Sequence, residues 1–358
     1  MAIDNKDKKV LNVPHLRFPE FSGEWENTEL QYIAPNICSG KDKPTSNGTV
    51  ALYGSTGIIG MTRLASYNEE IVLVARVGAN AGQLQITTIP CGVTDNTLII
   101  NAKEWNRYIY YYLQHYNLNR LVFGSGQPLI TGSMLKKLKI IYGEESERNK
   151  IVNLLCLLDE RIATQNKIIE DLKKLKSAIS ERLFKSVKGS TVLLSDLCDI
   201  VKGKQINGEN LSDSGNYYVM NGGTEPSGYY DNYNVEASTI SISEGGNSCG
   251  YVQFNTSPFW SGGHCYSIQN IADKVDNMYL YHYLKSNEDA IMKLRIGSGL
   301  PNIQKKDLAM FKIIVPKIEW QIKISTFLSS LERKAEIEER IQNVMQKQKL
   351  YLLQQMFI

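Results

Sequence analysis

The chain has 358 residues, a length that suits two or three domains. Hydrophobic residues make up 42% and charged residues 22% of it, which excludes a globally disordered protein. The balance of 40 basic against 37 acidic residues gives a net charge of +3, which excludes a polybasic protein of the histone type.

The start of the chain and its cysteines indicate the compartment. Residues 1–21 are polar and lack the apolar stretch of a signal peptide, and no apolar run approaches the roughly 18 residues of a membrane span. The six cysteines are scattered without a Cys-x-x-Cys pair, which is typical of reduced, partly buried thiols. We therefore expect a cytoplasmic protein that does not bind membranes.

The first globular part predicts a mixture of strands and helices. Ile71–Val77 and Leu138–Tyr142 are apolar runs typical of buried strands, and the Tyr-rich segment Tyr108–Tyr116 predicts a short helix. Turns rich in Gly, Ser and Thr, such as Tyr53–Gly57, indicate exposed loops. An α+β domain is therefore expected here.

A long helix follows. Residues 147–188 contain no Pro or Gly, and their apolar residues recur at steps of three and four, as in the a/d seam of a coiled coil. The seam residues are Ile151, Leu155, Leu158, Ile162, Leu172 and Ile179. Because this seam occupies one side of the helix, it needs a partner.

A second globular part and a second helix repeat this order. Ser238–Ser243 alternates like a half-exposed strand, and Met278–Leu284 predicts another Tyr-rich helix. A second seam begins after Pro316, where proline is tolerated near a helix start. Its residues are Ile324, Leu328, Leu331, Met345 and Leu352. Because each seam can serve as the partner of the other, we expect a coiled coil within the chain.

The chain is therefore two copies of one unit. The pattern Gly-Ser-Gly-x-Pro occurs at 124–128 and at 297–301, an offset of 297 − 124 = 173 that persists to the end of the chain. The same offset pairs Tyr108 and Tyr110 with Tyr281 and Tyr283. Further upstream the match is looser: Gly78–Gly82 resembles Gly245–Gly250, an alignment that places Glu244 opposite Val77.

Catalytic signatures are missing. The sequence has no GxxxxGK[ST] phosphate loop, no HExxH motif and no Asn-Pro-Pro-Tyr or Asp-Pro-Pro-Tyr of the kind amino-methyltransferases use. His264, Cys265 and Cys249 outline a partial metal site that lacks a fourth ligand. Asp171–Lys173 fits the tail of a nuclease motif, but a charged helix face explains it better. We predict a binding protein with no metal and no catalytic residue.

The distribution of charge complicates a nucleic-acid ligand. The first helix carries 10 basic and 6 acidic residues, whereas the second head carries 9 basic and 13 acidic residues. DNA phosphates are bound by Lys and Arg, so an acidic head is unfavourable. Such a chain could still read base edges with Asn, Gln, Ser, Thr and Arg while a partner neutralises the DNA backbone.

Several short motifs match those of one protein family. Leu16–Phe21 with Trp25 is similar to that family's N-terminal lead, and Leu30–Lys41 and Leu194–Lys204 are similar to the starts of its target recognition domains. Tyr53–Gly60 is similar to a segment within such a domain. Together with the order head, helix, head, helix, these motifs make nearly the whole chain resemble the specificity subunit of Type I restriction–modification enzymes.

The resemblance implies a non-catalytic subunit that reads double-stranded DNA. Each target recognition domain would read one half of a bipartite sequence in the major groove. The two helices would form an antiparallel coiled coil with pseudo-twofold symmetry and set the gap between the halves. Two modification (methyltransferase) subunits would dock on the helices and bring S-adenosylmethionine, since this chain would hold no cofactor. Restriction/translocase subunits would join them.

The implied α+β architecture divides the chain into five parts. They are an N-terminal lead (1–19), target recognition domain 1 (20–146), spacer helix 1 (147–188), target recognition domain 2 (189–316) and spacer helix 2 (317–358).

Candidate DNA-binding residues are chosen by loop position and side-chain type, because recognition domains vary too much for a motif to identify them. In the first head they are Lys41, Lys43, Ser55, Thr56, Arg76, Asn80, Ser125, Gln127 and Lys136. In the second head they are Lys204, Asn221, Thr224, Asn247, Ser298, Asn302 and Lys305. For Ser125, Gln127, Ser298 and Asn302, a helix cap or a turn is an equally good explanation.

Two other functions remain open. A duplicated coiled-coil adaptor whose heads bind protein or glycan ligands fits the low net charge, and strongly salt-dependent DNA binding by the assembled complex would count against it. An uncharacterised enzyme would show activity in the purified chain alone and lose it when an acidic residue or a histidine is replaced.

Overall fold

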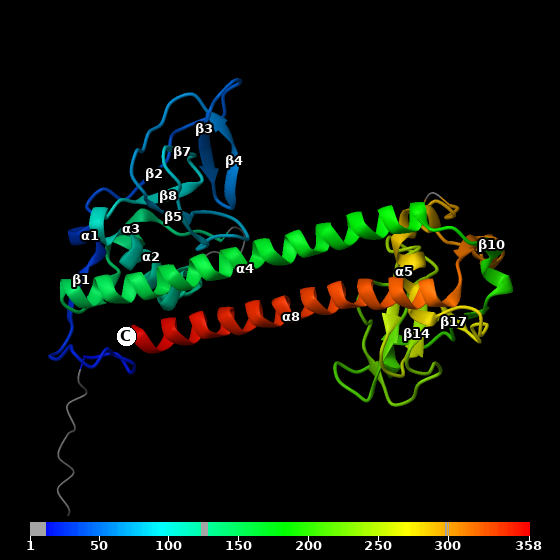
Figure 1. The fold of residues 1–358 in the computed structure, drawn as a ribbon. Coiled ribbons are helices and arrows are strands. Elements are labelled where there is room, and N and C mark those ends of the chain that lie inside the picture. The colour runs from blue at the N-terminus through cyan, green and yellow to red at the C-terminus, as the bar shows by residue number, and fades with distance from the viewer. Residues whose placement is uncertain (1–11, 123–127, 298, 300) are drawn as a thin grey trace, which may run out of the picture. The chain divides into compact units, whose positions relative to one another are not determined.

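A computed structural model describes residues 12–122, 128–297, 299 and 301–358 (Figure 1). The chain forms two compact units. Unit 1 combines Met1–Gln165 with Ile341–Ile358, and unit 2 is Asn166–Arg340. Both boundaries fall inside long helices, so each long helix contributes one part to each unit.

Unit 1 contains short strands and helices around the start of one long helix. In chain order these are β1 (Glu26–Glu29), α1 (Leu30–Ile33), β2 (Cys38–Ser39), β3 (Val50–Gly54), β4 (Gly57–Thr62), β5 (Val72–Ala75), β6 (Leu84–Ile86), β7 (Cys91–Val93), β8 (Thr97–Ile100), the 3-10 helix Lys103–Trp105, α2 (Asn106–Tyr116), the 3-10 helix Leu118–Leu121, α3 (Gly132–Lys136), β9 (Lys139–Tyr142) and the first part of α4 (Glu145–Ser186).

The strands of unit 1 form three small sheets. β1 pairs with β9, a four-stranded sheet has the order β2-β8-β5-β6, and a three-stranded sheet has the order β4-β3-β7. All four residues of β5 are buried, as expected for a central strand. Figure 1 shows α2 beside α4, with β3 and β4 on the side of the head away from α4.

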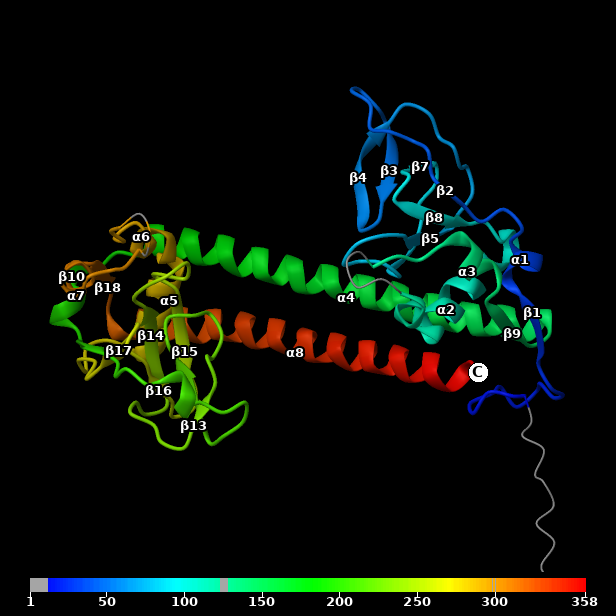
Figure 2. The same ribbon diagram turned by 180° about the vertical axis from the view of Figure 1, so that it is seen from behind.

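Unit 2 repeats this arrangement. Its elements are β10 (Ser190–Leu193), the 3-10 helix Leu194–Asp196, β11 (Asp199–Lys202), the 3-10 helix Gly208–Asn210, β12 (Tyr217–Met220), β13 (Tyr229–Tyr230), β14 (Thr239–Ser243), β15 (Val252–Asn255), β16 (Trp260–Ser261), β17 (Cys265–Gln269), α5 (Asn277–Ser286), α6 (Glu288–Met292), α7 (Lys305–Ala309), β18 (Lys312–Val315) and most of α8 (Ile318–Met356). Figure 2 shows its head with α5 next to α8.

The sheets of the two units correspond strand for strand. Unit 2 has a β10-β18 pair, a sheet of order β11-β17-β14-β15 and a sheet of order β13-β12-β16, each matching a sheet of unit 1. In both three-stranded sheets the middle strand pairs antiparallel with one neighbour and parallel with the other. The predicted α+β repeat of head and helix is therefore confirmed.

The strand at 239–243 differs from its prediction. The alternation of Ser and Ile suggested one exposed face, but all five residues of β14 are buried. The hydroxyls are satisfied inside the head: Ser241 Oγ accepts from Asn255 Nδ2 at 2.9 Å, and Ser243 Oγ donates to Gly222 O at 2.6 Å. Hydrogen bonding of this kind lets short polar side chains occupy a central strand.

The structure also corrects the alignment of the loop after the central strand by one residue. Gly78 N–H donates to Pro128 O at 3.0 Å, and Gly246 N–H donates to Pro301 O at 3.0 Å. Both glycines have positive φ, 80° and 76°. Gly78 therefore corresponds to Gly246 rather than Gly245, and Glu244 corresponds to Arg76 rather than to Val77.

The tyrosine pairs predicted by the 173-residue offset are shifted as well. Tyr108 Oη donates to Ile141 O at 2.8 Å, and Tyr279 Oη donates to Ile314 O at 2.7 Å, so these two tyrosines are equivalent. Tyr108 lies 5.5 Å from the ring of Phe357, and Tyr279 lies 5.8 Å from the ring of Phe184. One copy of the repeat therefore contains an insertion between these tyrosines and the Gly-Ser-Gly-x-Pro motif. A single constant offset without a gap misaligns the tyrosines for this reason.

The long helices run antiparallel within each unit. In unit 2, Lys173 Nζ pairs with Glu339 Oε1 and Lys176 Nζ pairs with Glu332 Oε1, both at 2.6 Å, so residue numbers rise along α4 as they fall along α8. In unit 1, Lys349 Nζ pairs with Asp159 Oδ1 at 2.6 Å. The predicted coiled coil is confirmed. Of the eleven predicted seam residues, Ile151, Leu155, Ile324 and Leu328 are buried, and Leu158, Ile162, Leu172, Ile179, Leu331, Met345 and Leu352 are half-buried.

The N-terminal lead binds to the start of α4 and to the end of α8. Arg17 Nε and Nη2 donate to the two carboxylate oxygens of Glu147 at 2.7 and 2.9 Å, and Trp25 Nε1 donates to the same carboxylate at 3.0 Å. Leu16 N–H donates to Gln355 O at 2.8 Å. The hydrogen-bonded ion pair raises the pKa of Arg17. Unit 1 is therefore held together by contacts from residues 16–25 to the start of α4 and the end of α8.

Replacing Phe357 by Ala should destabilise unit 1 by about 3–5 kcal/mol, because this ring is 2% exposed and its removal leaves a cavity between Tyr108 and Tyr112. Hydrogen exchange read by mass spectrometry measures the loss in peptides of the first head. Tyr351→Ala, on the same helix with 57% of the side chain exposed, is the matched control and should change stability by less than about 0.5 kcal/mol. Equal losses would contradict this packing.

Unit 2 should lose stability in mild acid through His282. Burial lowers the pKa of this histidine to about 4, and its Nε2 lies 2.9 Å from Ser329 Oγ. Below about pH 6.5 this histidine binds a proton in the unfolded chain but stays neutral in the folded unit. The free energy of unfolding should therefore fall by about 2 kcal/mol between pH 7 and pH 5. Denaturant titrations should show this dependence, and His282→Gln should remove it.

Candidate nucleic-acid interface

Predicted residues of unit 1 gather at one end of its four-stranded sheet. β2 and β5 both pair antiparallel with β8, so they run in the same direction and their C-terminal ends lie at the same end of the sheet. Lys41 and Lys43 follow β2, and Arg76 and Asn80 follow β5. We call this end of the sheet the loop end of unit 1. The loop end of unit 2 is the equivalent end of its sheet, where β11 and β14 finish.

Glycines fix the backbone at both loop ends. A Cβ on Gly40 would lie 2.2 Å from Val93 O, and a Cβ on Gly203 would lie 2.2 Å from Gly262 O. Only glycine allows the chain to pass so close to the neighbouring segment. The lysines that follow, Lys41 and Lys204, are exposed.

Arg76 places a guanidinium at the loop end of unit 1. Its N–H donates to Asn96 O at 3.0 Å, and its carbonyl accepts from Ile130 N–H at 2.9 Å, so its backbone is fixed. Nη1 donates to Ser39 Oγ at 3.4 Å, while the buried Nε has no partner within the described part of the chain. The guanidinium therefore retains donors for a ligand.

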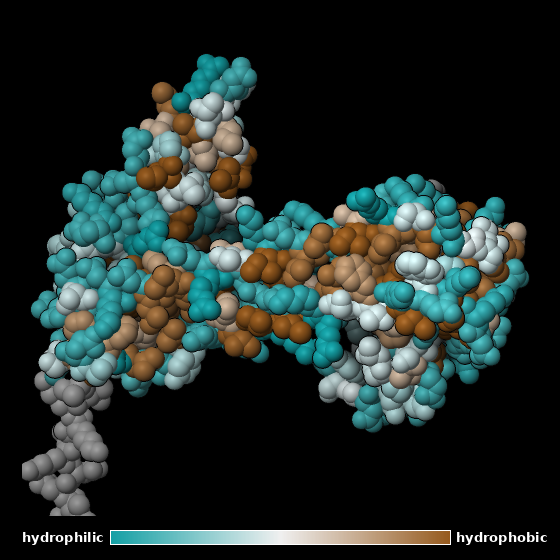
Figure 3. Space-filling view, viewed as in Figure 1, coloured by the Kyte–Doolittle hydropathy of each residue, from teal (hydrophilic) through white to brown (hydrophobic). Residues whose placement is uncertain are grey.

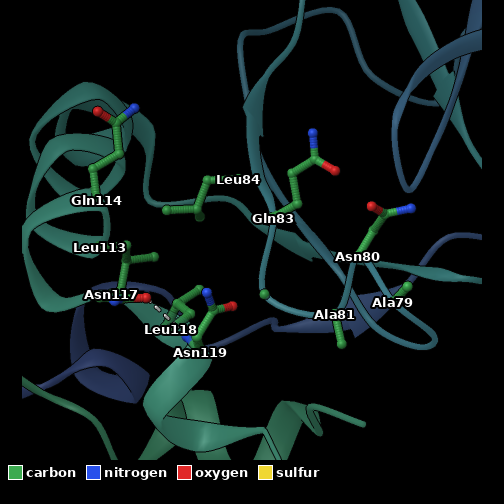
Figure 4. Close-up of a pocket in the computed structure, with 11 residues that line it drawn as sticks. Ala79, Asn80, Ala81, Gln83, Leu84, Leu113, Gln114, Asn117, Leu118 and Asn119 are labelled. Atoms are coloured by element: carbon green, nitrogen blue, oxygen red, sulfur yellow. Dashed lines mark hydrogen bonds between the residues drawn. The ribbon is translucent and has the colours of Figure 1, made fainter. Parts of the chain in front are cut away.

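A shallow pocket of about 330 Å³ lies beside the loop after β5 (Figure 4). Five of its lining side chains are amides, namely Asn80, Gln83, Gln114, Asn117 and Asn119. Figure 4 shows Gln114 across the pocket from Asn80 and Gln83. Amides offer both donors and acceptors, so this surface is suited to hydrogen bonding with base edges.

In unit 2, the side chains of Tyr251 and Lys285 occupy the space that corresponds to this pocket. Lys285 Nζ lies 3.9 Å from the centre of the Tyr251 ring and donates to Val252 O at 2.9 Å and to Glu288 Oε2 at 2.6 Å. The two heads therefore share a frame but present different surfaces.

The loop end of unit 2 brings four predicted residues together. Lys204 N–H donates to Ser261 O at 2.9 Å, and Asn221 Oδ1 accepts from His264 N–H at 3.2 Å. Asn302 pairs with Gly245 in an isolated antiparallel β-bridge, and Asn247 is exposed in the loop after β14.

Four residues that were not among the predicted DNA-binding residues lie among them, namely Lys202, Glu244, His264 and Tyr266. Glu244 Oε1 accepts from Lys202 Nζ at 2.6 Å and from Tyr266 Oη at 3.1 Å. Glu244 Oε2 lies 4.0 Å from His264 Nδ1 and makes no hydrogen bond to any described residue. Burial and the neighbouring carboxylate raise the pKa of Tyr266, which keeps its hydroxyl a donor. Isolated charged and polar side chains of this kind form no sequence motif, so nothing in the sequence assigned these residues to a binding surface.

The other predicted residues are dispersed. Ser55 and Thr56 form the β3–β4 turn, which Gln85 Nε2 holds by donating to Ser55 O at 2.8 Å. Lys136 is half-buried at the end of α3, Thr224 is exposed after β12, and Lys305 begins α7. Ser125, Gln127 and Ser298 lie outside the described residues.

The long helices expose apolar side chains (Figure 3). In unit 1 these include Leu157, Val344, Leu350 and Tyr351, and in unit 2 they include Leu175, Trp320, Phe327 and Ile337. A groove of about 740 Å³ between α4 and α8 in unit 1 is lined by residues that include Leu154, Leu158, Met345 and Leu352. Exposed apolar side chains grouped on a helix surface are suited to packing against another protein.

The described residues contain no group of three or more His, Cys, Asp or Glu side chains placed to hold a metal ion. None of their helices combines the length and apolar character that crossing a bilayer requires.

The family model for the Type I restriction modification DNA specificity domain matches residues 9–174 and 188–347. The chain is 34% identical over 122 residues to a putative type I specificity subunit of Mycoplasma genitalium, which is 34% of this chain and 31% of the relative. It is 25% identical over 282 residues to a putative type I restriction enzyme specificity subunit of Methanocaldococcus jannaschii, covering 68% of this chain and 65% of the relative. These alignments span less than two thirds of either relative.

The fold also matches a solved structure. The crystal structure of a Type I restriction–modification S subunit from M. genitalium superposes with a TM-score of 0.73 at 19% identity, covering 97% of this chain and 99% of that one. At this identity the match establishes the fold.

Proposed function

Since the chain belongs to the Type I restriction modification DNA specificity family, we propose that its two heads read the two halves of a bipartite double-stranded DNA sequence. The observation that carries this proposal is the repeated loop end. Each head places exposed Lys and Asn side chains, such as Lys41 and Asn80 or Lys204 and Asn247, at the same edge of the same sheet. Such side chains can reach phosphates and base edges.

The proposal assigns catalysis to partner subunits. Two modification subunits would dock on the apolar surfaces of α4 and α8, bring S-adenosylmethionine to an adenine in each half-site, and supply most of the contacts to the DNA backbone. Restriction/translocase subunits would join this complex. The chain itself would contribute binding and spacing, without a catalytic residue or a cofactor.

Purification from the native host tests the assembly. A tagged chain should recover a methyltransferase at two copies per chain, and the complex should bind DNA with an affinity that falls steeply as salt is raised. Sequencing of methylated adenines in the host should give one motif with two short specified halves. Recovery of unrelated protein or glycan ligands would instead support a duplicated adaptor, and methylation by the chain alone would indicate an enzyme.

The long helices should act as the spacer between the half-sites. Removing residues 165–171 from α4 and 337–343 from α8 takes two turns from each helix, about 10 Å at 1.5 Å per residue, which equals about three base pairs. The methylated motif should keep both halves and lose about three unspecified bases between them.

The control for this deletion is a double variant of full length in which exposed residues of the same segments are replaced, Lys167→Ala with Arg340→Ala. It should leave the methylated motif unchanged. A deletion that altered the half-sites themselves would mean that the helices read bases.

A further inference from the structure

The position directly after the central strand carries opposite charges in the two heads. Arg76 follows β5 and Glu244 follows β14. Arg76 N–H donates to Asn96 O at 3.0 Å, and Glu244 N–H donates to His264 O at 2.9 Å, so the two residues are structurally equivalent. A reversal of charge at one place in a shared frame calls for a physical reason.

In unit 2 the carboxylate of Glu244 is buried, and the side chains of Lys202 and His264 lie on its exposed side. The Glu244 side chain is 9% exposed, whereas Lys202 is 53% and His264 is 61% exposed. Glu244 is also held from within by the Tyr266 hydroxyl. A buried carboxylate is stable only when paired, and here the pairing orients an exposed ammonium. The acidic residue thus fixes a basic group at the surface.

Unit 1 presents a cation at the same place by a different route. Ser39 pairs with Leu98 and Lys202 pairs with Tyr266 in equivalent registers, so Ser39 stands where unit 2 has Lys202. The cation comes instead from Arg76, which contacts Ser39 through Nη1. Arg76 with Ser39 and Glu244 with Lys202 are therefore two side-chain arrangements that place a basic group at the same position of each loop end.

The remaining charges of unit 2 follow the same division. Lys202 and Lys204 lie at the loop end beside His264, where the loop after β12 carries the carboxylate of Glu225. The opposite end of the sheet is acidic: Asp199 begins β11, Glu236 precedes β14, and Asp276 precedes α5, whose first residue Asn277 contacts Ser238. Three of the thirteen acidic residues of this head, Asp199, Glu236 and Asp276, are thus turned away from its loop end.

We propose that Lys202 and His264 in unit 2, and Arg76 in unit 1, donate hydrogen bonds to acceptor atoms of bound DNA, with Glu244 as the positioning residue. The acceptors are phosphate oxygens or the O6 and N7 atoms of guanine, both of which bind Lys and Arg. This inference rests on the proposed function and adds the residues through which each head binds its half-site.

The test uses the complex assembled with its modification subunits. Lys202→Ser should weaken binding to the cognate duplex about ten-fold, whereas Lys274→Ser, at an exposed lysine beyond the opposite end of the sheet, should leave it unchanged. Glu244→Gln keeps the shape of the side chain but removes its charge, and it should weaken binding while the same subunits still co-purify. Arg76→Gln should produce the matching defect in unit 1.

A double variant separates DNA binding from folding. Lys202→Ser combined with Glu244→Arg recreates in unit 2 the arrangement that unit 1 has with Ser39 and Arg76. It should recover most of the affinity that Lys202→Ser removes, although the original ion pair is absent. A purely structural ion pair predicts no recovery, and that result would overturn the proposal.

The readouts also distinguish the type of acceptor. If Lys202 binds a phosphate, Lys202→Ser lowers affinity for every sequence and reduces the slope of log affinity against log salt by about one. If Lys202 binds a guanine, the same variant relaxes one position in one half of the methylated motif.

If Lys202→Ser matches the wild type in affinity, salt slope and motif, the inference fails while the proposed function stands. If the wild-type complex does not bind DNA, the proposed function itself fails.

Discussion

Burial of the apolar stripe on each long helix is the constraint on which the rest of the structure depends. Helices of this length are stabilised mainly by packing rather than by intrinsic propensity. In unit 1 the start of α4 packs into the head through Ile151 and Leu155, and the end of α8 fills the same core with Leu353 and Phe357. Phe184 and Leu328 do the same in unit 2. Each head is complete only with the start of one long helix and the end of the other, so both ends of the chain belong to one compact unit.

This constraint fixes the frame and leaves the loop ends free to vary. The cores are built from strands and from the Tyr-rich helices, whose hydroxyls bond to the backbone of β9 and β18. Apart from Tyr266, which belongs to the core of unit 2, the described loop-end residues named above lie outside these cores. An amide-lined pocket in unit 1 can therefore be replaced by the packed Tyr251 and Lys285 in unit 2 without a change of topology. Such independence is what a pair of heads with different specificities requires.

The sequence predicted the parts of this architecture that rest on long periodic patterns. The helices at 147–188 and 317–358 were visible because apolar residues recur along uninterrupted segments, and their observed bounds are Glu145–Ser186 and Ile318–Met356. Short elements were harder to judge. The exposure of Ser238–Ser243 depends on what covers the second face of the strand, and that information comes from tertiary contacts rather than alternation. The equivalence of Arg76 and Glu244 was hidden by a one-residue shift, because glycine spacing alone does not determine the register of a loop.

The acidic composition of the second head shows why summed charge is a poor guide to a binding surface. The interaction of two charges falls with distance and is screened within about 10 Å at moderate salt, so a ligand responds to the groups at its contact surface. Glu244 counts as a negative charge in the composition, yet its carboxylate is buried and paired with an exposed lysine. The composition of this head is therefore compatible with a polyanionic ligand at its loop end, provided that the acidic residues lie at the other end of the sheet or inside the fold. Three-dimensional placement, which the sequence does not reveal, is what removes the objection that net charge raises.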